Sequence, residues 1–175
     1  MKTTLRLKAV LFLVVACMFT SAAFAQMAAE PKKPASPRDS VSAVVAGSTI
    51  IINYGSPSVK GRKIWDGLVP YKAVWRTGAN EATRFTTTKA ITVEGKTLPA
   101  GTYGFFAIPG EKTWTIIFNS VSVQWGAFKY DASKDVLRVT VTPKPATKHE
   151  RLLYTIDANG FSLIWDELEV PVSIK

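Results

Sequence analysis

The feature that most restricts the fold of this chain is a series of short runs of β-branched and aromatic residues that end at glycine, proline or asparagine. The first two runs, 41–45 and 48–54, are joined by Ala46-Gly47, a break whose length and glycine suit a two-residue hairpin turn. No window of about 11 residues keeps the i, i+3, i+4 apolar spacing of an amphipathic helix. Since a parallel sheet needs helices to cover it, the pattern predicts an all-β, antiparallel fold.

The same alternation recurs along the rest of the chain. Short strands at roughly ten-residue intervals, with turn signals such as Asn159-Gly160 between them, are typical of a two-sheet sandwich or a barrel. We expect a single antiparallel two-sheet sandwich over 40–175, with jelly-roll and immunoglobulin-like topologies both open. The further strands that the pattern predicts are 82–87, 90–93, 104–108, 114–119, 136–142, 152–156, 161–165 and 169–174.

The chain begins with the three parts of a secretory signal peptide. Basic residues lie within 1–8, an apolar stretch too short to span a bilayer covers 9–20, and Ala23-Phe24-Ala25 has the small residues of a cleavage site. We therefore expect a signal peptide over 1–25, export through the Sec pathway, and a periplasmic or extracellular location.

Cleavage after Ala25 changes both the charge and the cysteine count. It removes three of the 22 basic residues and none of the 13 acidic ones, so the net charge falls from +9 to 19 − 13 = +6. It also removes the sole cysteine, Cys17, so we expect no disulfides in the mature protein. With the apolar stretch 9–20 removed as well, we expect no transmembrane helix in the mature protein. A faint likeness of 14–17 to a lipobox makes lipid anchoring through Cys17 the alternative. Residues 26–39, rich in proline, alanine and charge, are expected to be a linker.

One long region, about 55–80, interrupts the strand pattern. A connection of this length inside a compact domain is uncommon unless it has a function. Trp65, Tyr71 and Trp75 are interleaved with its charges, whose balance is +4. The basic residues of the region, set against the single acid Asp66, are Lys60, Arg62, Lys63, Lys72 and Arg76. An exposed cationic surface and a binding site for an anionic polymer are both compatible with this pattern.

The end of this region brings together side chains suited to a polar ligand. A guanidinium binds planar anions, a carboxamide pairs with hydroxyls, and an indole stacks on the apolar face of a sugar. We expect a site for a small polar ligand or an anionic glycan. Its candidate residues are Arg62, Trp65, Trp75, Arg76, Asn80 and Glu81.

Structural roles for the same residues stay open. Arg76 and Glu81 are close enough in sequence to form an ion pair with each other, and Asn80 suits a left-handed turn position. Trp65 and Trp75 have the size of core anchors.

A hydrolase is the enzymatic alternative. A glycosidase needs two carboxylates with different pKa values, one on each side of the scissile bond. Glu81 is the first candidate, as acid or base, and Asp66, Asp135 or Asp166 is the second. No sequence spacing ties any two of them together.

Other classes of site lack the residues they need. The only histidine, His149, is expected in a connection over 143–150, where a catalytic relay is not favoured. With one histidine and no mature cysteine we expect no metal site, and without a glycine-rich loop before a helix we expect no nucleotide or other cofactor. Nucleic acid is not an expected partner. The sequence does not define an oligomeric state.

Aromatic residues within the predicted strands are expected in the core. Trp114, Ile116 and Phe118 share one strand face, with Ile117 on the other. Trp125 stands beside Gly126 in a break between strands, where a core position is favoured and an exposed one stays open.

A series of distinctive motifs is spread over 40–175. They are Tyr54-Gly55-x-Pro57, Gly61-Arg62-x-Ile64-Trp65, Leu68-Val69-Pro70-Tyr71, Val74-Trp75-Arg76-Thr77-Gly78-Ala79-Asn80-Glu81-Ala82-Thr83, Leu98-Pro99-Ala100-Gly101-Thr102-Tyr103-Gly104, Trp114-Thr115, Asn119, Trp125-Gly126, Tyr130-Asp131 and Asp135-Val136-Leu137-Arg138-Val139. In these motifs the chain resembles a widespread family of exported bacterial domains, common in Bacteroidetes, whose function is unassigned. The resemblance implies an exported β-sandwich without assigning a reaction.

Three functions therefore stand in order. The first is a non-catalytic ligand-binding or cell-envelope-associated sandwich that recognises a polar or anionic ligand such as a glycan. The second is a hydrolase of extracellular glycans or related polymers that uses Glu81. The third is a structural domain for protein–protein interaction.

Overall fold

A computed structural model describes residues 36–175, so the expected signal peptide, Cys17 and most of the expected linker lie outside the described residues. The described part is built almost wholly of strands. Its elements are β1 (Arg38–Val45), β2 (Ser48–Gly55), β3 (Thr83–Thr87), β4 (Ile91–Val93), β5 (Lys96–Leu98), β6 (Gly101–Ile108), β7 (Trp114–Asn119), the 3₁₀ helix η1 (Ala132–Lys134), β8 (Asp135–Val141), β9 (Lys144–Asp157) and β10 (Gly160–Ser173).

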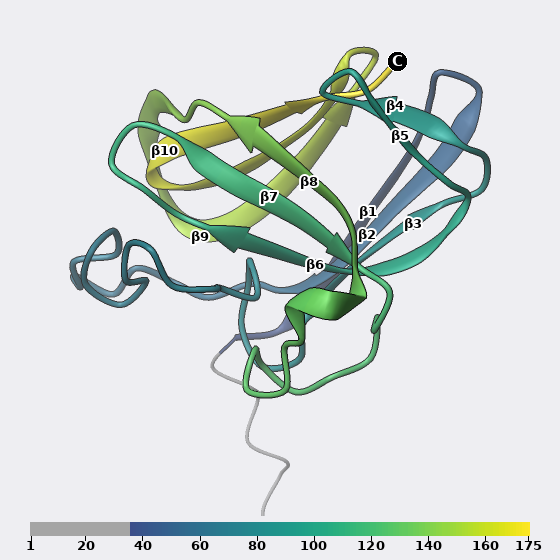
Figure 1. Ribbon diagram of the computed structural model, residues 1–175. Helices are drawn as coiled ribbons and strands as arrows, with labels where there is room; N and C mark the ends of the chain where they lie inside the picture. The colour runs from purple at the N-terminus through teal and green to yellow at the C-terminus, as the bar shows by residue number, and fades with distance from the viewer. Residues whose placement is uncertain (1–35) are drawn as a thin grey trace, which may run out of the picture. The chain divides into compact units, whose positions relative to one another are not determined.

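The strands form antiparallel sheets that pack against each other, which confirms the expected all-β sandwich. Six strands make one sheet in the order β1-β2-β3-β6-β7-β8, and the long hairpin β9-β10 forms the facing layer (Figure 1). A short β4-β5 hairpin joins the end of β10 through a bridge between Val93 and Ile174. No helix of the described residues has the length and apolarity to cross a membrane.

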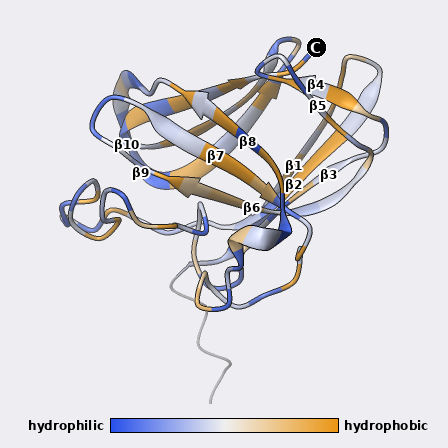
Figure 2. Ribbon diagram, viewed as in Figure 1, coloured by the Kyte–Doolittle hydropathy of each residue, from blue (hydrophilic) through white to orange (hydrophobic). Residues whose placement is uncertain are grey.

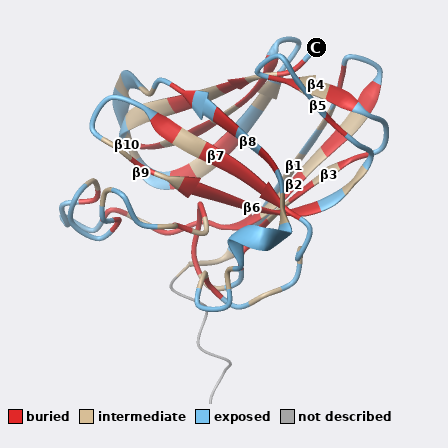
Figure 3. Cartoon of the chain, in the orientation of Figure 1, coloured by how far each residue is buried: buried red, intermediate tan, exposed pale blue. Residues whose placement is uncertain are grey.

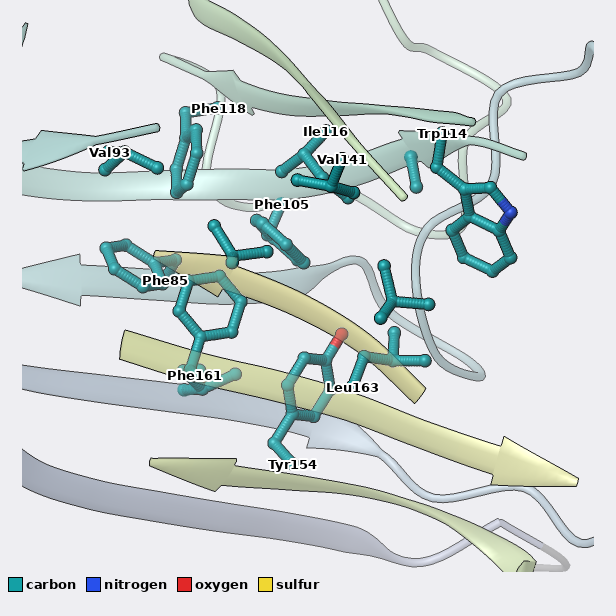
Figure 4. Packing of buried hydrophobic residues seen from close by; sticks show 14 of the residues in the cluster. Phe85, Val93, Phe105, Trp114, Ile116, Phe118, Val141, Tyr154, Phe161 and Leu163 are labelled. Atoms are coloured by element: carbon teal, nitrogen blue, oxygen red, sulfur yellow. The ribbon is translucent and has the colours of Figure 1, made fainter. Parts of the chain in front are cut away.

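The core lies between the six-stranded sheet and the β9-β10 hairpin. Phe161 of β10 packs against Phe85 of β3 and Phe105 of β6, with ring centroids 5.4 and 5.5 Å apart (Figure 4). Figure 3 shows that β6 and β7 are buried along most of their length. The predicted inward face of β7 is confirmed, because Trp114, Ile116 and Phe118 are all buried in this core.

Ile117 is buried on the opposite face of the same sheet. Together with Ala82 and Phe106 it forms a second, smaller core, against which Ala127 and Tyr130 of the loop after β7 pack. Both faces of the central strands are therefore covered, and β7 reads as a nearly continuous apolar run for that reason.

The first hairpin forms as expected. Ala46 and Gly47 have φ values of 50° and 74°, the left-handed pair of a type I′ turn, and Val41 pairs with Ile52 across the ladder. β1 begins at Arg38, so the sheet starts before the boundary expected at Ser40.

Three expectations about strands are corrected. The segment 96–98 forms β5. The pattern did not predict this strand because two of its three residues, Lys96 and Thr97, are polar. The expected connection 143–150 is the first half of β9, so His149 lies in a strand. The expected strands 161–165 and 169–174 are one strand, β10, which passes through irregular pairing at Asp166.

Candidate functional site

The long region between β2 and β3 ends in a bend that lies directly on β2. The backbone N–H of Ala79 donates to the carbonyl of Gly55 over 3.2 Å. A Cβ atom on Gly55 would stand 2.1 Å from the carbonyl oxygen of Ala79, and one on Gly78 would stand 2.9 Å from the carbonyl oxygen of Gly55. Only glycine permits this close approach, which explains both glycines in structural terms.

Buried hydrogen bonds hold the bend in place. Thr77 Oγ1 donates to the carbonyl of Phe105 over 2.9 Å, and Tyr154 Oη donates to the carbonyl of Thr77 over 2.8 Å. Burial raises the pKa of Tyr154, so its hydroxyl stays protonated as the donor. Thr77 and Asn80 have φ values of 51° and 64°, a conformation that non-glycine residues keep only when the surroundings fix it.

Next to the bend lies a cavity of about 250 Å³. Its wall contains two arginines and no acidic residue. We call it the arginine cavity. The side chains that matter for its chemistry are Arg62, Trp75, Arg76, Asn80 and Trp165.

Arg76 is the most unusual of these side chains. Its guanidinium is partly buried, and its Nε is fully buried with no hydrogen-bond partner among the described residues. No carboxylate among residues 36–175 lies within salt-bridge distance of it. Burial lowers the pKa of Arg76 from its ordinary value, which is the mark of a cation that has lost water without gaining an anion.

Arg62 and Asn80 are held by backbone groups at the rim of the cavity. Arg62 donates from Nε to the carbonyl of Val59 over 3.0 Å and from Nη2 to the carbonyl of Ser58 over 2.5 Å. Asn80 Nδ2 donates to the carbonyl of Ser36 over 3.0 Å. Asn80 therefore takes the left-handed turn position that its residue type suggested and also lines the cavity.

Four of the five tryptophans form a cluster beside the arginine cavity. Trp65 contacts Trp114, Trp75 and Trp165 with ring centroids 5.0, 5.8 and 5.8 Å apart. Trp75 stacks on Trp165 at 6.1 Å and an interplanar angle of 17°. The core-anchor role left open for Trp65 and Trp75 is therefore observed. Trp75 also forms part of the cavity wall, and Trp65 does not.

Glu81 lies apart from the arginine cavity. Its Oε2 accepts a hydrogen bond from Arg38 Nη1 over 2.9 Å, so the ion pair considered between Arg76 and Glu81 does not form. Glu81 is exposed and borders a separate depression with Arg38 and Arg84. A backbone hydrogen bond at Glu81, assisted by Arg38, lowers the pKa of its carboxyl group.

The carboxylates named as second catalytic groups are dispersed. Asp135 accepts hydrogen bonds of 2.6 Å from both Tyr130 and Arg138, so it is part of a structural cluster at the start of β8. Asp66 is exposed beside Lys63 at 4.0 Å. Asp166 lies at the irregular position of β10.

Two features were not foreseen from the sequence: two residues of the arginine cavity, and a separate, larger cavity. Trp165 and Ser36 line the arginine cavity, yet they come from opposite ends of the domain and no local motif joins them to Arg76. A larger cavity of about 480 Å³ lies between β8 and β10, beside Glu94, Asp157 and Glu169. None of the expected site residues reaches that second cavity.

Fold and site together define a class: a small antiparallel sandwich with a cavity of about 250 Å³ whose wall contains two arginines and no acidic residue. The chain belongs to the family described as a protein of unknown function (DUF2911), whose pattern matches residues 36–174, from just before β1 to just after β10. No curated protein and no solved structure matches the chain. This match confirms the expectation that the chain belongs to a family of unassigned function.

Proposed function

We propose that this domain is an exported, non-catalytic binding protein that takes a small carboxylate-bearing ligand, such as one unit of an acidic glycan, in the arginine cavity. The observation that carries the proposal is Arg76, a partly buried guanidinium with a buried Nε and no anion among the described residues. A buried cation without a partner is costly, and a bound carboxylate would remove that cost.

The chemistry of the cavity wall supports this class of ligand. A guanidinium donates two parallel hydrogen bonds to a carboxylate, a geometry that a single ammonium does not match. Asn80 lies at the rim, where a carboxamide suits hydroxyl groups, and the edge of Trp75 offers an apolar surface. Arg62 adds a second positive charge, and no acid lines the wall to oppose an anion.

The size of the cavity supports a small ligand. Pockets that enclose drug-sized molecules usually have about 300–1,000 Å³. A cavity of about 250 Å³ suits a single sugar unit or a small organic acid. A longer glycan would extend beyond the cavity, and the exposed basic residues Lys60 and Lys63 belong to the same long region.

No observation favours the hydrolase alternative. A catalytic acid needs a raised pKa, whereas the pKa of Glu81 is lowered and its carboxylate is paired with Arg38. A second carboxylate facing Glu81 is not found among residues that line its depression.

Isothermal titration calorimetry with D-glucuronate, D-galacturonate and inorganic phosphate tests the proposal, with D-glucose as the neutral probe. We expect binding of at least one anionic probe and none of glucose. Arg76→Ala should weaken that binding about 10- to 100-fold, since a charge-assisted hydrogen bond contributes roughly 1.5–3 kcal/mol. Arg76→Lys should lose most of the affinity as well, because it keeps the charge and loses the fork.

The matched control is Lys72→Ala, which removes one positive charge from the same long loop but does not touch the arginine cavity. This variant should bind like the unaltered protein. The proposal fails if none of the anionic probes binds, if glucose binds equally well, or if Lys72→Ala and Arg76→Ala weaken binding to the same extent.

A further inference from the structure

A second surface of the domain has a different chemistry from the arginine cavity. Seven large apolar side chains are exposed among the described residues, and four of them lie in the loop that follows β7. Val123, Trp125 and Phe128 are 77%, 62% and 85% exposed, and Val121 is 39% exposed. We call residues 121–128 the apolar loop. Side chains exposed singly need no explanation, but this concentration of them in one loop indicates a partner.

The apolar loop is fixed by its backbone. The N–H of Ala82 donates to the carbonyl of Gln124 over 2.9 Å, and the N–H of Gly126 donates to the carbonyl of Asn80 over 3.0 Å. Behind it, Tyr130 packs edge-on against Phe106 with centroids 5.2 Å apart. These contacts hold the loop against the sheet while the side chains of Val123, Trp125 and Phe128 stay exposed.

The charged groups next to the apolar loop are mainly positive. Lys129 and Lys134 are exposed, and no carboxylate of the described residues lies within salt-bridge distance of either. Arg84 lines a depression together with Val123, and the acid in that depression, Glu81, is paired with Arg38. The single acid within 120–134 is Asp131, whose carboxylate accepts the N–H of Ser133 over 2.9 Å. Figure 2 shows hydrophobic and hydrophilic segments alternating along this lower end of the domain.

The same end of the domain receives the chain from its N-terminal segment. Ser36, the first described residue, accepts a hydrogen bond from Asn80, and the carbonyl of Asn80 in turn binds Gly126 of the apolar loop. The 35 residues that precede Ser36 include the apolar stretch 9–20, which the sequence predicts to be the export signal.

We propose that the apolar loop is a membrane-contact surface that inserts Val123, Trp125 and Phe128 into the interface of an anionic phospholipid bilayer. Tryptophan and phenylalanine favour the boundary between headgroups and acyl chains, and neighbouring lysines bind anionic headgroups. Exposed apolar side chains that gather on one loop suit a fluid interface. A stable protein interface instead buries about 800 Å² on each partner around a well-packed centre. This inference is independent of the arginine cavity.

The test uses the full chain with vesicles of phosphatidylethanolamine and phosphatidylglycerol that contain dibrominated phosphatidylcholine, a quencher of tryptophan emission within the bilayer. Trp75, Trp114 and Trp165 are buried in the core, and Trp65 packs among them, so Trp125 is the indole that the quencher should reach. We expect part of the emission to be quenched in the unaltered protein and that part to disappear in Trp125→Phe.

A positional control separates contact through this loop from attachment through the N-terminal segment. Val44 is 69% exposed near the far end of β1, roughly 20 Å along the strand from Arg38. Figure 1 shows the β1–β2 turn and the loop after β7 at opposite ends of the sheet. The double variant Trp125→Phe/Val44→Trp should show no quenching of the new indole, although both positions are equally open to solvent.

Three outcomes would overturn the proposal. The first is emission from Trp125 that is not quenched while the protein sediments with the vesicles. The second is equal quenching of the indole at position 44. The third is a dimer, measured by light scattering without vesicles, that dissociates in Phe128→Ser, because a second copy of the chain would then be the partner. Vesicles of phosphatidylcholine alone should bind the unaltered protein less than the anionic vesicles do.

Discussion

Arg76 and Trp114 illustrate two different consequences of burial at the scale of the residue. Arg76 is a charged group whose Nε is buried without a partner among the described residues, and this makes it the best candidate for ligand recognition. Trp114 is 1% exposed and contributes a large apolar surface to the core between the sheets. The first residue leaves an interaction open and the second stabilises the fold, and their substitution should separate function from stability.

Trp114→Ala should lower the free energy of unfolding by about 3–5 kcal/mol, because it leaves a large cavity beside Trp65 and Trp75. Urea denaturation followed by circular dichroism measures the change. Val44→Ser, at an exposed position, is the control and should stay within about 0.5 kcal/mol of the unaltered protein. A shift of that small size for Trp114→Ala would contradict its burial.

Tyr130 gives the stability of the protein a dependence on alkaline pH. Burial, with a contribution from the hydrogen bond to Asp135, raises the pKa of Tyr130 from 10.0 to about 12. Between these values the unfolded chain loses the phenolic proton and the folded chain keeps it, so the free energy of unfolding falls as the pH rises. Denaturant titrations at pH 9, 10, 11 and 12 should show that the free energy of unfolding falls less steeply with pH in Tyr130→Phe than in the unaltered protein. The difference between the two slopes should correspond to at most one proton. An identical slope in both proteins would exclude this role.

At the scale of the element, two connections show how backbone geometry limits the residue types that a position can hold. The β1–β2 turn needs two residues with positive φ, and the chain supplies Ala46 and Gly47. The bend over β2 needs a backbone without side chains at two facing positions, and the chain supplies Gly55 and Gly78. The first requirement is local and was predicted. The second joins residues far apart in the chain, and the sequence alone did not reveal it.

Ala46→Asn should raise the free energy of unfolding on the order of 0.5–1 kcal/mol, because asparagine tolerates the left-handed conformation better than alanine does. Thermal denaturation measures this as a higher Tm. Gly47→Ala, at the next position of the turn, should change the Tm in the opposite direction, although nothing lies within 4 Å of its added Cβ atom. Equal Tm values for all three proteins would contradict the assigned turn.

Gly55→Ala should separate the bend from β2 and cost at least about 1–3 kcal/mol, because its Cβ atom would stand 2.1 Å from the carbonyl oxygen of Ala79. Chemical denaturation measures the loss, and calorimetry with the anionic probes should show weaker binding as well. Gly61→Ala in the same long region has open space around its Cβ atom and carries only the strain of a φ of 68°, so it is the comparison without a steric clash. A smaller loss for Gly55→Ala than for Gly61→Ala would argue against the close approach.

At the scale of the whole molecule, the two sheets bring distant segments to one place. The arginine cavity uses residues from the start of the domain, from the long region and from β10. The apolar loop lies beside the bend that carries Asn80 and Glu81, through hydrogen bonds to Asn80 and a bridge to Trp125. The chain has 22 basic and 13 acidic residues, and this net positive charge favours anionic partners.

Salt should distinguish the cavity from this general positive surface. Raising the ionic strength from about 0.05 to 0.5 M shortens the screening length severalfold and should weaken binding of a long anionic polymer to the exposed lysines steeply. Binding of a single carboxylate in the partly enclosed arginine cavity should weaken less, as measured by calorimetry at both salt concentrations. If higher salt weakens the affinity for the polymer and the affinity for the small carboxylate equally, the small ligand binds on the open surface.

The sequence by itself determined the all-β class, the first hairpin, the inward face of β7 and the position of the long irregular region. These features depend on alternation and turn chemistry, which act between neighbouring residues. Only the tertiary structure decided that Arg76 has no anionic partner among the described residues while Glu81 pairs with Arg38. It also decided that Trp165 lines the cavity and that Trp125 is exposed, where the sequence favours a core position. Those outcomes depend on which distant strands and loops meet, and the strand pattern does not contain that information.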